Sequence, residues 1–150
     1  MNIADCLEQG LLAKTRPDNE KAFSSIEMAA HKIELAEKEF AHQLFESAII
    51  SAYASMFHSA RALLFKDGFK ERSHFAVYVF ASEKYANQIE RKFLSELNSL
   101  RLQRHELMYG LEKNIEIQEE NADSAIKLGK GFLQAIQKIL QKNKNAKPHF

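Results

Sequence analysis

The segment 42–66, HQLFESAIISAYASMFHSARALLFK, is the most apolar part of the chain and decides its fold. Two apolar stripes recur along it with the 3.6-residue period of an α-helix. A helix with two apolar faces packs against neighbours on two sides, so the sequence predicts a central helix here. Asp67-Gly68 ends it, with Gly68 in the left-handed cap conformation. The stripes are Phe45, Ile49, Ala52, Met56, Ala60, Leu63 and Ile50, Tyr53, Phe57, Leu64.

The segments on either side of this helix predict further helices. We expect a short helix over 3–14, a second with Pro17 in its first turn, and a fourth capped by Ser73. A fifth is expected over 89–109 and a last over 121–142, whereas 69–72 is a charged loop and 111–120 is ambiguous. The prediction is all-α, an up-and-down bundle of about five to six helices. Residues 1–142 form its single domain, and 143–150 form a frayed basic tail.

The composition limits the classes of function. Lys and Arg number 21 and Asp and Glu number 20, so the net charge of +1 gives no global attraction to nucleic acid or membrane. A nucleic-acid site must then be a local patch. A single cysteine, Cys6, indicates a reducing compartment. The start of the chain lacks the pattern of a secretion signal, and no stretch approaches the roughly 18 apolar residues of a membrane span. We expect a soluble, cytoplasmic protein.

An arginine stands in phase with the apolar residues of the fifth helix. The stripe runs through Phe93, Leu97 and Leu100 to Arg104. A buried guanidinium needs an anionic or polar partner. Arg104 is therefore either an internal ion pair, an arginine that reaches the edge of the core, or part of an anion site such as a phosphate site.

A polar row runs beside this arginine on the same helix. Arg101, His105 and Tyr109 follow one another at four-residue spacing. Together with Arg104 they supply two permanent cations, an imidazole and a phenol, which could bind a phosphodiester and move protons. The alternative, and the commoner use of such a row, is a solvated polar edge.

Residues 104–109, RHELMY, resemble the signature of the HEPN superfamily (higher eukaryotes and prokaryotes nucleotide-binding). That signature is an arginine, a polar residue and, a short way further on, a histidine. Tyr109 stands at the histidine position, as in a subgroup of small prokaryotic HEPN proteins. Residues 51–64, SAYASMFHSARALL, are similar to the long central helix of that subgroup. Gly68-Phe69, Ser73-His74 and residues 7–14, LEQGLLAK, are similar to it as well.

The resemblance implies a helical bundle that dimerises, often beside a minimal nucleotidyltransferase acting as its antitoxin partner. Many HEPN proteins are metal-independent endoribonucleases in which arginine holds the scissile phosphate and histidine moves protons. Carried over, these roles make Arg104, His105 and Tyr109 the catalytic candidates. Arg101, in the polar row of the same helix, is a substrate-binding candidate. Other members of the superfamily have lost activity and serve as binding or assembly modules.

Tyr109 leaves the general base open. A phenol has an unperturbed pKa near about 10, so it is a poor base at neutral pH. His105 is the first replacement and His74 the second, because the loop that carries His74 also brings Lys70 and Arg72. His74, Lys70 and Arg72 are in addition substrate-binding candidates. Positions five apart on a helix also point about 140° apart, so Arg104 and Tyr109 cannot aim at one point from one face.

No cofactor or metal is expected. The Glu-x-x-His pattern of di-iron bundles occurs at 39–42 and 71–74, but both copies fall at predicted helix junctions. Two functions stay open. The first is a toxin-like homodimer that acts on RNA, as a metal-independent endoribonuclease. The second is a non-catalytic module that docks on a nucleotidyltransferase.

Overall fold

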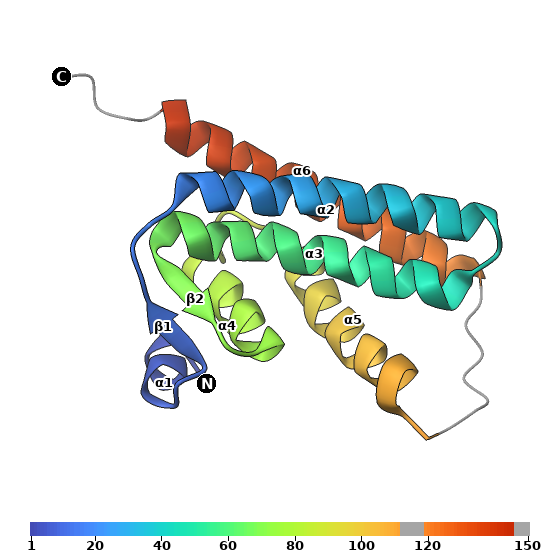
Figure 1. The fold of residues 1–150 in the computed structure, drawn as a ribbon, viewed down its shortest axis with the longest axis horizontal. Helices are drawn as coiled ribbons and strands as arrows, with labels where there is room; N and C mark the ends of the chain where they lie inside the picture. Colours follow the sequence, from blue (N-terminus) through green and yellow to red (C-terminus); the bar gives the residue numbers. More distant parts are fainter. Residues whose placement is uncertain (112–118, 146–150) are drawn as a thin grey trace.

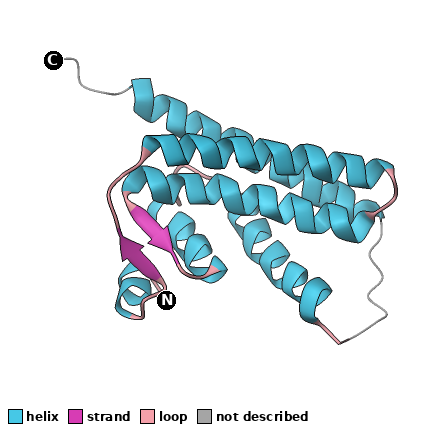
Figure 2. Cartoon of the chain, in the orientation of Figure 1, coloured by secondary structure: helices cyan, strands magenta, loops and turns pink. Residues whose placement is uncertain are grey.

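The computed structural model describes residues 1–111 and 119–145, with side chains as far as 142. Six helices and one two-stranded ribbon form within these residues (Figures 1 and 2). The expected all-α bundle is confirmed. The elements are α1 Ile3–Glu8, β1 Leu12–Lys14, α2 Asn19–Ala41, α3 Phe45–Asp67, β2 Phe69–Glu71, α4 His74–Lys84, α5 Arg91–Tyr109 and α6 Glu119–Asn145.

Helix α3 is the centre of the bundle, as its two apolar stripes predict. It forms an antiparallel pair with α2, and α2 and α6 lie along one side of it while α4 and α5 lie along the other (Figure 1). Twelve of its 23 residues are buried, which requires neighbours on more than one side. Gly68 ends the helix at φ 82°, the predicted left-handed cap.

The length and composition of α3 would also suit a membrane span. Its most apolar 18-residue window has a mean hydropathy of 1.2, a feature that counting uninterrupted apolar residues overlooks. Within the bundle, however, 67% of that window is buried against other helices. The apolar residues of α3 therefore form the core of the bundle.

Two local predictions at the N-terminal end are wrong. The helix expected over 3–14 stops at Glu8, because Gly10 turns the chain at φ 76°. Leu12–Lys14 then pairs antiparallel with Phe69–Glu71, the segment expected as a loop. Pairing satisfies backbone groups that two isolated loops would leave to water.

The ribbon leads directly into α4. Arg72 donates its backbone N–H to the Leu11 carbonyl at 2.8 Å, and Ser73 then caps the helix by accepting from the Ala76 N–H at 3.0 Å. This confirms Ser73 as the predicted cap. The first residue of α4 is His74, so the β1–β2 ribbon positions that side chain.

Three further expectations differ in detail. Asp18 caps α2, so Pro17 precedes the helix instead of lying in its first turn. Phe23, assigned to the apolar stripe of α2, is 65% exposed, because it lies at the edge of the face that meets α3 and α6.

Helix α6 extends to Asn145, beyond the expected end at 142. Most of the ambiguous segment, 112–118, and the last part of the expected tail, 146–150, lie outside the described residues.

Candidate functional site

Helices α3, α4 and α5 bring aromatic and cationic side chains together around His74. The Tyr53 hydroxyl lies 2.7 Å from His74 Nδ1, within hydrogen-bond distance. The Phe57 ring stacks on the imidazole with 4.2 Å between ring centroids, and the Tyr53 ring lies 5.7 Å from it. Tyr53 is only 1% exposed and His74 is partly exposed. The imidazole is therefore held on two sides and open on another.

Arg101 and Arg104 of α5 border the same group. The Arg104 guanidinium lies 5.8 Å from the centre of the Tyr53 ring, and that of Arg101 lies 5.1 Å from the centre of the Phe75 ring. Arg101 also donates to the Asn98 side chain at 3.0 and 3.2 Å. Both arginines are partly exposed. Among the residues that the structure describes, neither has a carboxylate within 4.0 Å, so both charges remain available to an anion.

The environment holds His74 neutral. Burial lowers the pKa of His74, and the positive charges of Arg104, Arg101 and Arg61 lower it further. Burial raises the pKa of Tyr53 to about 12, so its phenol keeps its proton at neutral pH. The site therefore combines two permanent cations with a neutral imidazole and a neutral phenol.

Three residues of α3 at or beside this site were not predicted as functional. Tyr53 and Arg61 lie on one line of the helix with Phe57, at four-residue spacing, and His58 follows Phe57. Arg61 forms an ion pair with Glu71 at 2.6 Å, so part of its charge is neutralised. Burial, Arg61 and Lys32 lower the pKa of His58 to about 4. Periodicity placed Tyr53 in an apolar stripe of the predicted helix, and the polar residues His58 and Arg61 on the same helix were a signal that could have revealed this face.

The other predicted site residues lie apart from His74. The rings of His105 and Tyr109 are 5.1 Å apart and exposed, Tyr109 to 62%. Lys70 and Arg72 are exposed on and after β2. Within the described part of the chain, none of these four forms a hydrogen bond, an ion pair or a ring contact with Tyr53 or His74. The structure thus brings Arg101, Arg104 and His74 together and leaves His105 and Tyr109 as a second, exposed pair.

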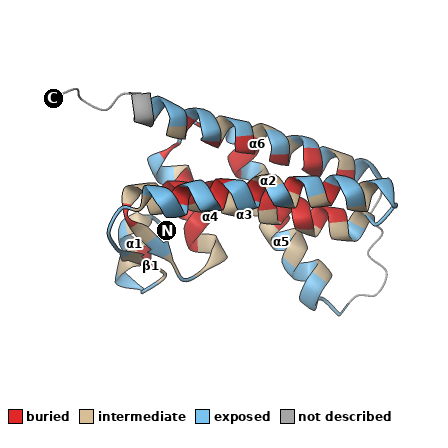
Figure 3. Ribbon diagram, turned by 45° about the horizontal axis from the view of Figure 1, so that its top comes forward, coloured by how far each residue is buried: buried red, intermediate tan, exposed pale blue. Residues whose placement is uncertain are grey.

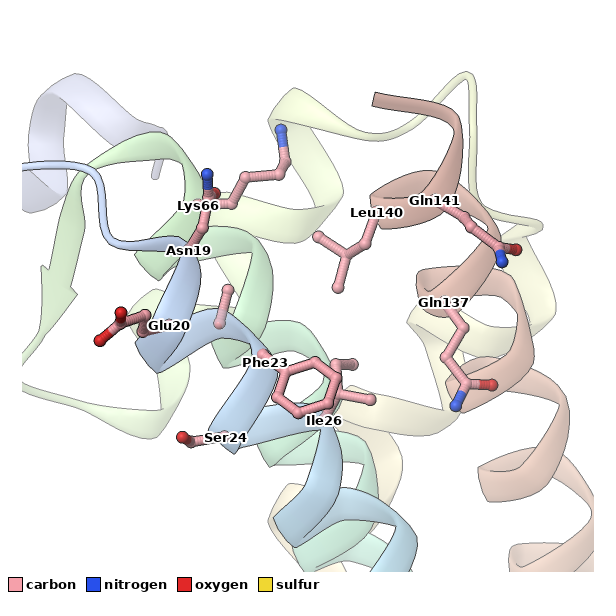
Figure 4. A pocket seen from close by; sticks show the side chains of 10 residues that line it. Asn19, Glu20, Phe23, Ser24, Ile26, Lys66, Gln137, Leu140 and Gln141 are labelled. Atoms are coloured by element: carbon pink, nitrogen blue, oxygen red, sulfur yellow. The ribbon is translucent and has the colours of Figure 1, made fainter. Parts of the chain in front are cut away.

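A hollow in the described part of the chain lies away from this site. It opens between the first half of α2 and the last turns of α6, with Phe23, Ile26, Leu140 and Gln137 on its walls (Figure 4). It contains none of the predicted site residues. The part of the chain that the structure describes also holds no group of three or more His, Cys, Asp or Glu side chains placed to bind a metal ion.

Comparison with known proteins gives two findings. The sequence profile of the family described as "HEPN domain" matches residues 23–140. A protein of Methanocaldococcus jannaschii named "Putative toxin MJ0605" is 30% identical over 122 residues, which cover 77% of this chain and 86% of that relative. Both matches include α3, α4 and α5, the helices that carry the site.

Proposed function

The chain belongs to the HEPN family, and from this premise we propose that it is a toxin-like protein that acts on RNA as a homodimer. The name of its archaeal relative, which describes a toxin, supports the biological role. The observation that carries the proposal is the pair of arginines, Arg101 and Arg104, beside the neutral His74. Two guanidinium groups without carboxylate partners in the described residues suit the oxygens of a phosphodiester.

Arg104 would hold the phosphate and Arg101 a second oxygen or the neighbouring phosphate. Arg104 rests on the Tyr53 ring, which orients the guanidinium without neutralising it. A lysine would present one compact charge there, without the planar pair of donors. Lys70 and Arg72, exposed on the ribbon next to α4, could extend contact along the RNA backbone.

Cleavage would use the RNA's own 2′-hydroxyl. The 2′-oxygen forms a bond to phosphorus and loses its proton to a base, while the bond from phosphorus to the 5′-oxygen breaks and that oxygen takes a proton. His105 is the candidate base, with the Tyr109 phenol beside it as a hydrogen-bond donor. The products would end in a 2′,3′-cyclic phosphate.

A second copy of the chain could bring the two halves of such a site together. The C-terminal part of α5 projects from the bundle (Figure 1) and ends in an exposed segment (Figure 3). Apolar side chains are exposed along this half of α5 and just after it. Leu102 is 52% exposed, Met108 46% and Leu111 96%. Apolar surface of this kind favours association. In a dimer through this surface, His105 and Tyr109 of one copy would face the arginines of the other.

The test combines toxicity with RNA cleavage by the purified chain. Expression should stop growth, and the protein should cut RNA in the presence of a chelator while leaving DNA intact. Arg104→Ala should abolish both effects. Arg91→Ala, which removes an exposed arginine from the first turn of the same helix, should preserve them. Wild-type protein that neither binds nor cuts varied RNAs would refute the proposal.

Tyr109 favours a second candidate, a non-catalytic module that docks on a nucleotidyltransferase. A phenol at the motif's histidine position is a poor base. Tyr109→His separates the two functions. Cleavage that increases in this variant supports the nuclease. RNA that stays uncut by both proteins, together with stable binding of a nucleotidyltransferase, supports the module.

A further inference from the structure

We propose that His74 serves as a neutral N–H donor to the phosphate held by Arg101 and Arg104, with Tyr53 as the positioning residue that fixes its tautomer. This inference rests on the proposed RNA binding and deepens it. It assigns His74 to recognition of phosphate and removes it from the candidates for general base.

The tautomer follows from the hydrogen-bonding needs of Tyr53. Its side chain is 1% exposed, so water does not reach its hydroxyl. Among the described residues, the acceptor within reach of that hydroxyl is His74 Nδ1, at 2.7 Å. A buried phenol without an acceptor destabilises the folded protein, because its hydroxyl has lost its hydrogen bonds to water. The O–H therefore donates to Nδ1, and the proton of the neutral imidazole resides on Nε2.

Nε2 is the ring atom that a ligand can reach. It makes no hydrogen bond within the described residues, and it is not among the buried polar atoms that lack a partner. It is therefore open to solvent. The Phe57 ring stacks on the imidazole at 4.2 Å and fixes its plane, and a 180° turn within that plane would break the bond from Tyr53 to Nδ1. Nε2–H is thus a donor of fixed direction next to two guanidinium groups.

The same bond opposes protonation of His74. An imidazolium carries hydrogen on both nitrogens, so Nδ1 could no longer accept from Tyr53, and the buried phenol would lose its acceptor. The charged groups around the ring act in the same direction. Arg61 of α3 and Arg101 and Arg104 of α5 all lower its pKa. His58, also on α3, is itself neutral at pH 7.

The role has a clear consequence for catalysis. A neutral imidazole with its proton on Nε2 has no exposed lone pair, so it cannot take the proton of the 2′-hydroxyl. It can stabilise a phosphate oxygen through one N–H bond, at every pH where it stays neutral. The base of any cleavage reaction must then be another group. Of the two histidines predicted as bases, His105 is the one that remains.

The first experiment reads the tautomer directly in the full chain. The chemical shifts of the two imidazole nitrogens, measured by NMR at pH 7 after ¹⁵N labelling, distinguish a protonated from an unprotonated nitrogen. We expect Nε2 protonated and Nδ1 unprotonated for His74. A proton on Nδ1 overturns the inference, whether or not the protein binds RNA.

The second experiment measures binding of a fluorescent 2′-O-methyl oligouridylate, which lacks the 2′-hydroxyl needed for cleavage. His74→Leu should weaken binding about ten- to a hundred-fold, the loss of one hydrogen bond to a charged group. His74→Gln, which can place an N–H near the same point, should recover most of that loss. The His74→Leu variant gives the pH dependence of binding that comes from all other groups. After that dependence is subtracted, wild-type affinity should stay constant between pH 6 and 8.

Tyr53→Phe supplies the decisive comparison. Without the phenol, protonation of His74 no longer leaves a buried donor unpaired, so affinity should begin to rise at a higher pH than in wild type, below the ordinary imidazole pKa of about 6.5. Tyr85→Phe is the matched control, since it removes another buried phenol, the one that donates to Asp67. The affinity of Tyr85→Phe for the oligouridylate should stay constant between pH 6 and 8, as in wild type.

The outcomes separate this inference from the proposed function. Loss of binding in Arg104→Ala with no effect of His74→Leu would retain the RNA site and overturn the role of His74. A wild-type profile that already tightens below pH 6.5, and does so equally in Tyr53→Phe, would also overturn it. Absence of binding in every protein would refute RNA binding and with it the phosphate-donor role, while the NMR result would still decide the tautomer.

Discussion

Acid should destabilise the fold through His58. Burial, Arg61 and Lys32 lower the pKa of His58 in the folded protein to about 4, against an ordinary value of 6.5. Folding therefore favours the neutral ring, and the unfolded chain binds the proton more readily. The stabilisation is fully present above about pH 6.5 and is lost as the pH falls toward 4.

The size of the effect follows from the shift. Each pKa unit corresponds to about 1.36 kcal/mol, so lowering the pH from 7.5 to 5 would remove about 2 kcal/mol of the free energy of unfolding. The His58 ring is only partly buried, and solvent screening reduces this to about 1 kcal/mol. Urea unfolding at a series of pH values measures it.

The difference between variants isolates His58 from the other titrating groups. His58→Gln keeps a polar side chain without a titratable ring, so it should lose about 1 kcal/mol less than wild type over this range. His31→Gln, which changes an exposed histidine on α2, should retain the wild-type dependence. Equal losses in wild type and His58→Gln would refute the reasoning.

Three further changes test the fold and the site. Gly68→Ala should lower the free energy of unfolding in urea by about 2 kcal/mol or more, because at φ 82° the added Cβ would lie 2.7 Å from the Thr15 carbonyl oxygen. Gly10→Ala is the control: its Cβ would enter open space at φ 76°, so backbone strain alone should lower that free energy by about 1–2 kcal/mol. Arg104→Ala should change the free energy of unfolding by no more than about 1 kcal/mol, yet reduce the slope of log affinity for RNA against log salt by about 1. Leu102→Glu should shift light scattering from dimer toward monomer, and Ser99→Glu on the same helix should not; a monomeric wild type at high micromolar concentration would count against the dimer.

Periodicity predicted the central helix well because the signal is long. Over 23 residues, α3 repeats its apolar pattern about six times, and its Gly68 cap has a specific conformational requirement. The β1–β2 ribbon was missed because three-residue strands contain no measurable period. Its pairing also depends on contact between segments far apart in the chain. Local pattern therefore predicted the long elements and missed the short ones.

The candidate site could be predicted only in part for a similar reason. Arg104 was noticed because it falls in phase with Leu97 and Leu100. Helical phase, however, does not say how deeply a side chain is buried. Its long side chain reaches the edge of the core and rests on Tyr53 instead of pairing inside. The bond between Tyr53 and His74 joins two helices, and no spacing rule connects residues on different helices.

The pairing of β1 with β2 also sets an order of events during synthesis. Lys14 leaves the ribosome about 55 residues before Phe69, an interval of roughly three to eleven seconds at about 5–20 residues per second. Throughout this time the N-terminal segment has no strand partner. The helix that begins with His74 and the helix that carries Arg104 are translated later still. A nascent chain thus lacks the cluster of Arg101, Arg104 and His74 until most of it has been made.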